Sequence, residues 1–195
     1  MGTMTTEPAY RDRLLSGLAQ VLESKSYRDI TLADIAAAAR VSRRTFYEQF
    51  SSKDDCLLAL ADYTSNAILA TVLDEYSPAK AWPVLVRDIT RAYLIFIESK
   101  PQLMRALHVE LAALGEPGVR MRRKVAEQFA RFLQEQVARQ REAGELLQPL
   151  SLPMGMALVA GINELILYAL SEQSGGSLKA LAPVAEELIH RVVAT

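Results

Sequence analysis

The chain has 195 residues, of which 50% are hydrophobic and 23% are charged, so it is neither a disordered nor a fibrous protein. Its one cysteine, Cys56, excludes a disulfide within the chain and a CxxC-type metal site, and we expect a buried thiol in a reducing compartment. The formal net charge of −1 excludes a uniformly basic surface, so any contact with nucleic acid must be local.

The N-terminal residues lack the positive start and apolar stretch of a signal peptide. No apolar run approaches membrane-spanning length, because the most apolar window, residues 154–170, is interrupted by Gly161, Asn163 and Glu164. We therefore expect a soluble, cytoplasmic protein with no membrane partner, in which this window forms a buried or interface helix.

Hydrophobic residues recur with a period near 3.6 along the chain, which predicts an all-α fold. One face of a first helix is marked by Leu14, Leu15, Leu18 and Leu22. Thr31 and Asp34 have the spacing of a capping box and predict the start of a second helix. Ser42 is a suitable N-cap for a short third helix over residues 43–50.

Caps, glycines and prolines predict where the other helices start and end. Ser52 and Asp55 repeat the capping-box spacing and predict that a long fourth helix starts at Lys53. Further along, Pro78 precedes an expected helix, and Gly144 suits the C-cap of a long one. The Ser-Gly-Gly-Ser segment at residues 174–177 predicts a flexible loop between the final two helices.

The segment over residues 31–50 fits a helix, a tight connection and a second helix, which is the length of a helix-turn-helix. Phe46 and Phe50 lie four positions apart, so they share the face of the third helix that we expect to pack on the core. Tyr47 lies roughly 100° around the helix from Phe46 and is expected to stay accessible.

Between Arg40 and Lys53, four basic residues accompany one acidic residue, Glu48. Arg43 and Arg44 fall in the first turn of the third helix, where the macrodipole disfavours cations by roughly 0.3–1 kcal/mol each. An isolated basic pair is more often a solvated helix face. Here the pair opens the second helix of a helix-turn-helix, whose N-terminal residues meet base edges, so the spacing favours DNA contact.

The stretch ITLADIAAAARVSRRTFYEQFSSKDD resembles the DNA-binding signature of the TetR family of transcriptional regulators. The resemblance covers the first quarter to third of the chain. It implies a DNA-contacting set, in which we include the N-cap serine: Thr31, Ser42, Arg43, Arg44, Thr45, Tyr47, Gln49 and Lys53. One departure is Arg40, where many family members have glycine; a positive φ there would store about 1–2 kcal/mol of strain.

The resemblance also implies a helix-turn-helix domain over residues 8–53 and a helical ligand-binding and dimerisation domain over residues 54–195. A homodimer is expected because the helix over residues 154–170 is apolar nearly all round and needs a partner surface. By resemblance, the protein binds a palindromic operator as a repressor and is released by a small-molecule effector. Activation stays open, since DNA binding does not set the sign of regulation. Neither a cofactor nor a metal is expected.

Several aromatic and polar side chains are candidate ligand-binding residues, with core packing as the alternative: Trp82, Tyr93, Phe96, Met104, His108, Phe129, Asn163, Glu164 and Tyr168. Asn163 and Glu164 lie on an otherwise apolar helix, where an unpaired buried carboxylate is costly. Each therefore needs a polar partner, either in an effector cavity or across a dimer interface. Both interpretations stay open.

Two other functions compete with regulation: a helical ligand-binding protein without DNA binding, and a small all-α enzyme. Two histidines, one cysteine and the lack of a phosphate-cradling glycine loop argue against catalysis. Glu187 and His190 match the Glu-x-x-His spacing of di-iron bundles, but the second copy that such a site needs is missing. We expect a solvent-facing pair and a protein that is not an enzyme.

Overall fold

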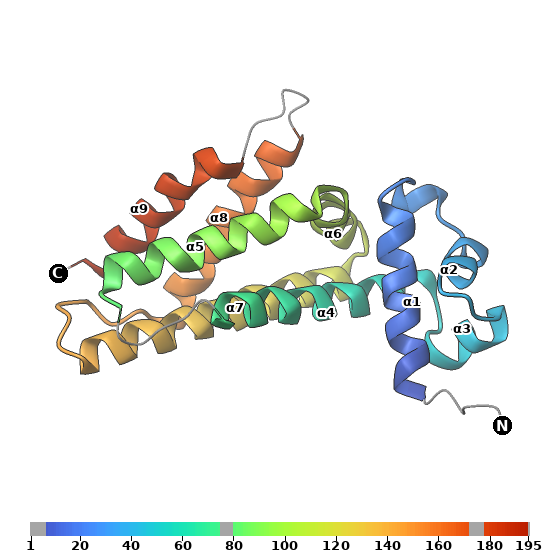
Figure 1. Cartoon of the computed structure of the whole chain (residues 1–195), viewed down its shortest axis with the longest axis horizontal. Coiled ribbons are helices and arrows are strands. Elements are labelled where there is room, and N and C mark those ends of the chain that lie inside the picture. Colours follow the sequence, from blue (N-terminus) through green and yellow to red (C-terminus); the bar gives the residue numbers. More distant parts are fainter. Residues whose placement is uncertain (1–6, 75–79, 172–177, 195) are drawn as a thin grey trace. The chain divides into compact units, whose positions relative to one another are not determined.

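The structure, a computed structural model, describes residues 7–74, 80–171 and 178–194, and every named element within these ranges is a helix. The predicted all-α fold is therefore confirmed (Figure 1). Pro78 and the expected loop over residues 174–177 lie outside the described residues.

The helices follow one another in chain order with short connections. They are α1 (Glu7–Leu22), η1 (Tyr27–Asp29), α2 (Leu32–Ala38), α3 (Arg43–Gln49), α4 (Lys53–Asp74), α5 (Trp82–Ser99), α6 (Pro101–Ala113), α7 (Glu116–Glu142), α8 (Leu152–Ser171), η2 (Leu178–Leu181) and α9 (Ala182–Val193), where η marks a 3₁₀ helix. The second to fourth helices begin within a residue of the predicted starts, because local caps set those starts.

The chain forms two compact units that are not continuous in sequence. Unit 1 contains residues 1–64 and 102–121, and unit 2 contains residues 65–101 and 122–195. Helix α4 begins in unit 1 and ends in unit 2, and most of α6 belongs to unit 1. The domain boundary expected between residues 53 and 54 coincides with the first turn of α4 and stays a prediction.

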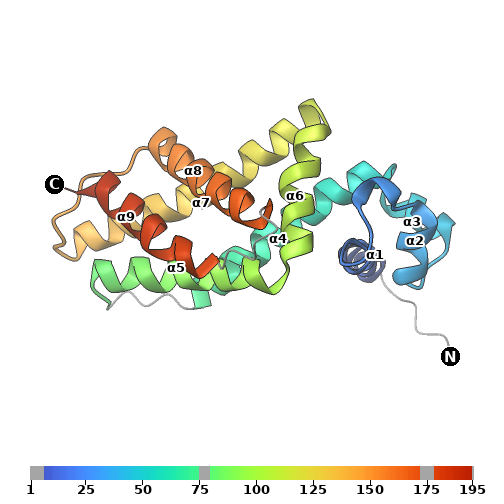
Figure 2. The same ribbon diagram turned by 90° about the horizontal axis from the view of Figure 1, so that it is seen from above.

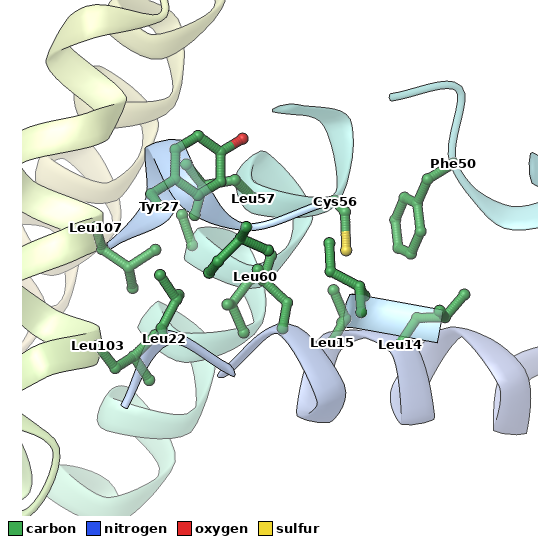
Figure 3. Close-up of a cluster of buried hydrophobic side chains, with 14 of the residues drawn as sticks. Leu14, Leu15, Leu22, Tyr27, Phe50, Cys56, Leu57, Leu60, Leu103 and Leu107 are labelled. Carbon is green, nitrogen blue, oxygen red and sulfur yellow. The ribbon is translucent and has the colours of Figure 1, made fainter. Parts of the chain in front are cut away.

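The core of unit 1 is built on the leucine face of α1. Its four predicted members are buried, and Leu14 and Leu18 are completely inaccessible to solvent. Figure 3 shows Leu103 and Leu107 of α6 beside Leu22 at the end of α1. Fully burying a leucine is worth about 1.5–3 kcal/mol, so this shared core holds α1 and α6 together.

The predicted N-caps are confirmed. Thr31 Oγ1 accepts a hydrogen bond from the backbone N–H of Asp34 at 3.2 Å, and the Asp34 carboxylate accepts one from the backbone N–H of Thr31 at 2.8 Å. Ser42 and Ser52 each accept from the N–H three residues later at 3.0 Å. The pKa of Asp34 is lowered, first by the hydrogen bond from Lys25 and then by the one from the Thr31 backbone.

Unit 2 is a helical bundle in which α9 lies alongside α5 and α8, as the views in Figures 1 and 2 agree. Its centre contains fully buried aliphatic side chains such as Leu85, Ile97 and Ile166. Gly144, just beyond the end of α7, has a φ of 98°, which confirms the predicted C-cap.

Helix α4 and residues Leu152–Leu170 of α8 are long and apolar enough to cross a membrane, by length and composition alone. The sequence did not predict these two spans, because polar residues interrupt the apolar runs, whereas the mean hydropathy of each whole helix is high. Core helices of globular proteins meet the same criteria, and 44% of the α4 window is buried inside the structure.

Arg40 adopts a left-handed backbone conformation with a φ of 53° in the turn between α2 and α3. The Arg13 guanidinium of α1 donates hydrogen bonds to the carbonyl oxygens of Ala39 at 3.0 Å and of Arg40 at 2.6 Å. This side chain therefore satisfies carbonyls that the end of α2 leaves open and holds the strained turn in place.

Replacing Arg40 should test the strain directly. Arg40→Gly is expected to be more stable than Arg40→Ala by about 0.5–1 kcal/mol, because glycine adopts positive φ without a Cβ clash but loses more backbone entropy on folding. Both variants remove the same side chain, so their difference in urea unfolding free energy isolates the backbone term. An alanine variant at least as stable as the glycine variant would show that the turn is unstrained.

Candidate nucleic-acid interface

Helix α3 has seven residues, which is too few for a stable isolated helix, so packing must hold it. Phe46 is completely buried, and its ring centroid lies 5.8 Å from that of Phe50. Both rings belong to the core of unit 1, where Phe50 lies close to Cys56 (Figure 3). The predicted division of α3 into a core side and an outer side is therefore confirmed.

The outer side of α3 carries Arg43, Arg44 and Tyr47, all exposed, with Tyr47 at 54%. The Arg44 Nε donates to Glu48 at 3.0 Å across one helical turn, and the Arg44 side chain is 89% exposed. A pair this exposed contributes at most about 0.5 kcal/mol. Arg44 can therefore leave Glu48 for a stronger acceptor at little cost.

Thr31, Ser42 and Thr45 lie at helix starts, whereas Gln49 is the last residue of α3. Thr31 and Ser42 are exposed N-caps of α2 and α3, whereas Thr45 and Gln49 are half-buried. The Thr45 hydroxyl lies 2.9 Å from that of Ser42. Because the first N–H groups of a helix point outward and carry positive partial charge, such starts are suited to phosphate oxygens.

Lys53 has a structural role that the sequence did not reveal. Its Nζ donates to the carbonyl oxygens of Tyr27 and Ile30 at 2.8 Å each, and lies 4.3 Å from the centroid of the Tyr27 ring. The ammonium thus ties η1 to the start of α4. Whether it also meets a phosphate stays a prediction.

A second bond reinforces the same junction. The Tyr27 hydroxyl donates to Asp54 Oδ1 at 2.5 Å. Burial raises the pKa of Tyr27, and the bond to Asp54 raises it further, so the phenol stays a donor over the whole neutral range. The start of α4 is therefore fixed to the turn that precedes the helix-turn-helix.

Two residues of α1 were missed by the sequence reasoning, although they position the interface. An added Cβ at Gly17 would lie 2.9 Å from the backbone nitrogen of Ala39, so glycine permits close packing of α1 on the end of α2. A glycine inside a predicted helix was the available signal. The Arg11 guanidinium lies 4.6 Å from the centroid of the Phe50 ring, a contact that no local pattern indicates.

Unit 2 contains a cavity of about 60 Å³ between its helices. Its walls are almost entirely apolar and come from α4, α5, α7, α8 and α9: Val72, Ile89, Thr90, Tyr93, Leu94, Phe129, Phe132, Leu133, Val159, Ile162, Asn163, Ala185 and Ile189. Of the predicted ligand-binding residues, the cavity brings together Tyr93, Phe129 and Asn163.

These three side chains are joined. The Tyr93 hydroxyl donates to Asn163 Oδ1 at 2.5 Å, linking α5 to α8, and the Tyr93 and Phe129 rings meet edge to face at 5.6 Å. Burial raises the pKa of Tyr93, which therefore stays neutral. The partner that Asn163 was expected to need is thus found inside unit 2.

The other six predicted ligand-binding residues are not among the lining side chains of this cavity. Trp82 is buried at the start of α5 with its ring 6.2 Å from that of His190, and Phe96 has the Lys100 ammonium over its ring. Met104 and His108 lie on α6, where the Met104 carbonyl oxygen is 2.7 Å from His108 Nδ1.

Glu164 and Tyr168 are exposed on α8 of the single chain, on the side away from Ile166 of the core. They sit one helical turn apart, so they share one face. Glu187, exposed on α9, pairs with Arg191 across one turn at 2.6 Å, so its carboxylate already has a cationic partner.

Helix α3 exposes basic and aromatic side chains and is held in place by a buried phenylalanine. A helix of this kind, as the second helix of a helix-turn-helix, is typical of a DNA-binding regulator. Residues 14–60 match the family described as bacterial regulatory proteins of the tetR family. The nucleoid occlusion factor SlmA of Shewanella denitrificans is 30% identical over 131 residues, an alignment that covers 66% of this chain and 66% of that protein. The chain belongs to the TetR family of transcriptional regulators.

Solved structures show the same fold. The regulator FadR of Bacillus subtilis in complex with stearoyl-CoA aligns with a TM-score of 0.74 at 16% identity, covering 91% of this chain and 96% of that one. A transcriptional regulator of Saccharomonospora viridis in complex with choline aligns with a TM-score of 0.72 at 16% identity, covering 95% of this chain and 98% of that one. Family membership makes the chain a regulatory protein and not an enzyme.

The junction at Lys53 yields a stability prediction. Lys53→Met should lower the free energy of unfolding by about 1–3 kcal/mol, because two carbonyl groups lose their charged donor. Lys25→Met is the matched control, since Lys25 is an exposed residue whose 2.7 Å ion pair with Asp34 lies at the surface, where such pairs add little stability. Equal losses in the two variants, measured by urea unfolding, would remove the structural role assigned to Lys53.

Proposed function

We propose that the protein is a cytoplasmic TetR-type repressor that binds a palindromic operator as a homodimer and is released by a small-molecule effector. The observation that carries this proposal is the outer side of α3, where Arg43, Arg44 and Tyr47 are exposed while Phe46 is buried. A recognition helix needs this division, because one side must be held rigidly while the other reads bases.

The exposed residues fall into two roles in the proposed complex. Arg43 and Arg44 at the start of α3 read base edges, since an arginine pairs bidentately with guanine in the major groove. Thr31, Ser42 and Tyr47 bind phosphates together with the N–H groups at the helix starts, and thereby set the register of the helix. Thr45, Gln49 and Lys53 complete the proposed contact set.

Dimerisation is proposed through α8 and α9. Only 28% of the apolar α8 window is buried within the chain, and Met154, Gly161 and Tyr168 lie on its exposed side. An apolar surface of this kind is covered in a stable protein, and a two-fold copy of the same helices is the simplest cover. Glu164 lies on that side too, which favours the interface among its two interpretations.

The cavity of unit 2 supports an effector site, since it is concave, apolar and built around the Tyr93–Asn163 pair. Helix α4 supplies both Lys53 in unit 1 and Val72 in the cavity wall. Effector binding is proposed to shift this helix and so change the spacing of the two recognition helices. The coupling is reciprocal, because operator DNA must weaken effector binding by the same factor.

The similarity to SlmA favours a second candidate, a nucleoid occlusion factor, which is what the relative is named. Both candidates bind DNA, so they differ in the consequence of binding. Selecting bound sequences from random DNA tests the shared property and gives the half-site spacing. Release of the selected DNA by a ligand of the cavity then favours the repressor.

The DNA-binding face is tested with the selected sequence. Arg44→Ala should weaken binding by about 1–3 kcal/mol and relax the preference at one base pair, because a base contact is lost. Tyr47→Phe should weaken binding to all sequences alike, since a phosphate contact carries no sequence information. Fluorescence anisotropy with the selected and mutated duplexes measures both effects.

The matched control for Arg44 is Arg131→Ala. Arg131 is also an exposed arginine that pairs with a glutamate one turn away, at 2.6 Å, but it lies on α7 in unit 2. Equal affinity losses for the two alanine variants, or no loss for Arg44→Ala, would argue against α3 as the recognition helix.

The dimer interface is tested at Gly161. An added Cβ there meets nothing within 4 Å in the single chain, so Gly161→Arg should leave the monomer fold intact. In a dimer it places a charge in an apolar interface and should shift the equilibrium to monomer, as measured by analytical ultracentrifugation. Ala138→Arg on an exposed side of α7 is the control. A dimer that tolerates Gly161→Arg would place the interface elsewhere.

A further inference from the structure

Arg40 is the one non-glycine residue with a positive φ in the part of the chain that the structure describes. This conformation costs an arginine free energy that it does not cost glycine, because the Cβ crowds the following carbonyl oxygen. Strained residues of this kind persist where the surrounding structure enforces them, and they cluster at functional sites. The Arg40 side chain is therefore a candidate for a role outside the fold.

The fold makes no use of the Arg40 guanidinium. It is exposed and has no hydrogen bond or ion pair with any described residue. The bonds that hold the turn come from Arg13 and end on the carbonyl oxygens of Ala39 and Arg40, so glycine at position 40 would keep them. Arg40 borders a hollow of about 290 Å³ beside α1, in which Asp12 is the one acidic lining residue among those described. The guanidinium therefore has room to turn toward a partner.

The four basic residues around α3 differ in what already holds them. Lys53 donates to two backbone carbonyls, and Arg44 donates to Glu48. Arg40 and Arg43 have no such partner among the described residues. Two uncommitted cations therefore lie three residues apart at the start of α3.

The short separation of Arg40 and Arg43 places both within reach of one groove of DNA. Three residues span at most about 11 Å even when the chain is extended. The major groove is about 12 Å wide, and phosphates run along both of its edges. Recognition helices bring their N-terminal residues to base edges inside this groove. When Arg43 meets a base, the long side chain of Arg40 therefore reaches the phosphates that flank it.

We infer that Arg40 is a further DNA-contacting residue, which binds a backbone phosphate beside the bases that α3 reads. This inference rests on the proposed DNA-binding function of α3. It adds a contact that the family resemblance does not imply, since many members have glycine at this position. The guanidinium suits the role because it stays charged and binds two phosphate oxygens at once. Such a contact fixes the register of α3 without reading the sequence.

Three substitutions separate the charge of Arg40 from its backbone strain. Arg40→Gly removes both, Arg40→Gln removes only the charge, and Arg40→Lys keeps both. Fluorescence anisotropy with the full chain and the selected duplex gives the affinity between about 50 and 200 mM salt. Arg40→Gly and Arg40→Gln should each flatten the slope of log affinity against log salt by about 0.9 for each half-site, because one phosphate contact is lost. Arg40→Lys should keep the native slope.

The matched control is Arg131→Ala, which also removes one exposed positive charge but lies on α7 in unit 2. It should leave the salt slope unchanged. Arg40→Gly should unfold at a urea concentration at least as high as the native chain does, so its weaker binding cannot come from unfolding. Its loss of affinity should also be equal on the selected and the mutated duplexes, since a phosphate contact carries no sequence information.

Several results would overturn the inference: an unchanged salt slope for Arg40→Gly and Arg40→Gln, weaker binding by Arg40→Gly alone, or a loss confined to one base pair of the duplex. A lower stability of Arg40→Gly than of the native chain would show that the side chain serves the fold. Failure of the native chain to bind any duplex would remove the DNA-binding proposal as well. An unchanged slope alongside tight native binding removes this inference alone, so the two failures are distinguishable.

Discussion

The burial of Phe46 is the interaction on which the DNA-binding face depends. A helix of seven residues cannot persist without tertiary contacts, and α3 obtains them by placing this ring in the core shared with α1, α4 and α6. Because successive helical residues point in different directions, fixing Phe46 also fixes where Arg43, Arg44 and Tyr47 point. Packing in the core beneath α3 therefore keeps the recognition surface rigid.

Local features that cost stability gather around this helix. Two arginines occupy its first turn, where the helix dipole disfavours them, and Arg40 holds a positive φ just before it. Such conflicts between local preference and fold concentrate at functional sites. The structure offsets them nearby, since Arg13 bonds the carbonyls of the strained turn and Gly17 lets α1 approach it closely.

The central feature of unit 2 is a cavity between its helices. Its helices leave a small apolar space, where the Tyr93 hydroxyl and the Asn163 side chain are bonded to each other. Helix α4 contributes residues to both units.

The sequence alone determined the helical fold, the starts of α2, α3 and α4, and which side of α3 faces the core, because caps and periodicity act within a few residues. It left open the φ of Arg40 and gave no indication that Lys53 bonds two carbonyls. Only the tertiary structure decided that Tyr93, Phe129 and Asn163 share a cavity while Trp82, Glu164 and Tyr168 do not line it. It also showed that the buried Thr90 hydroxyl has no hydrogen-bond partner among the described residues. Those outcomes depend on contacts between residues far apart in the chain, which no local pattern encodes.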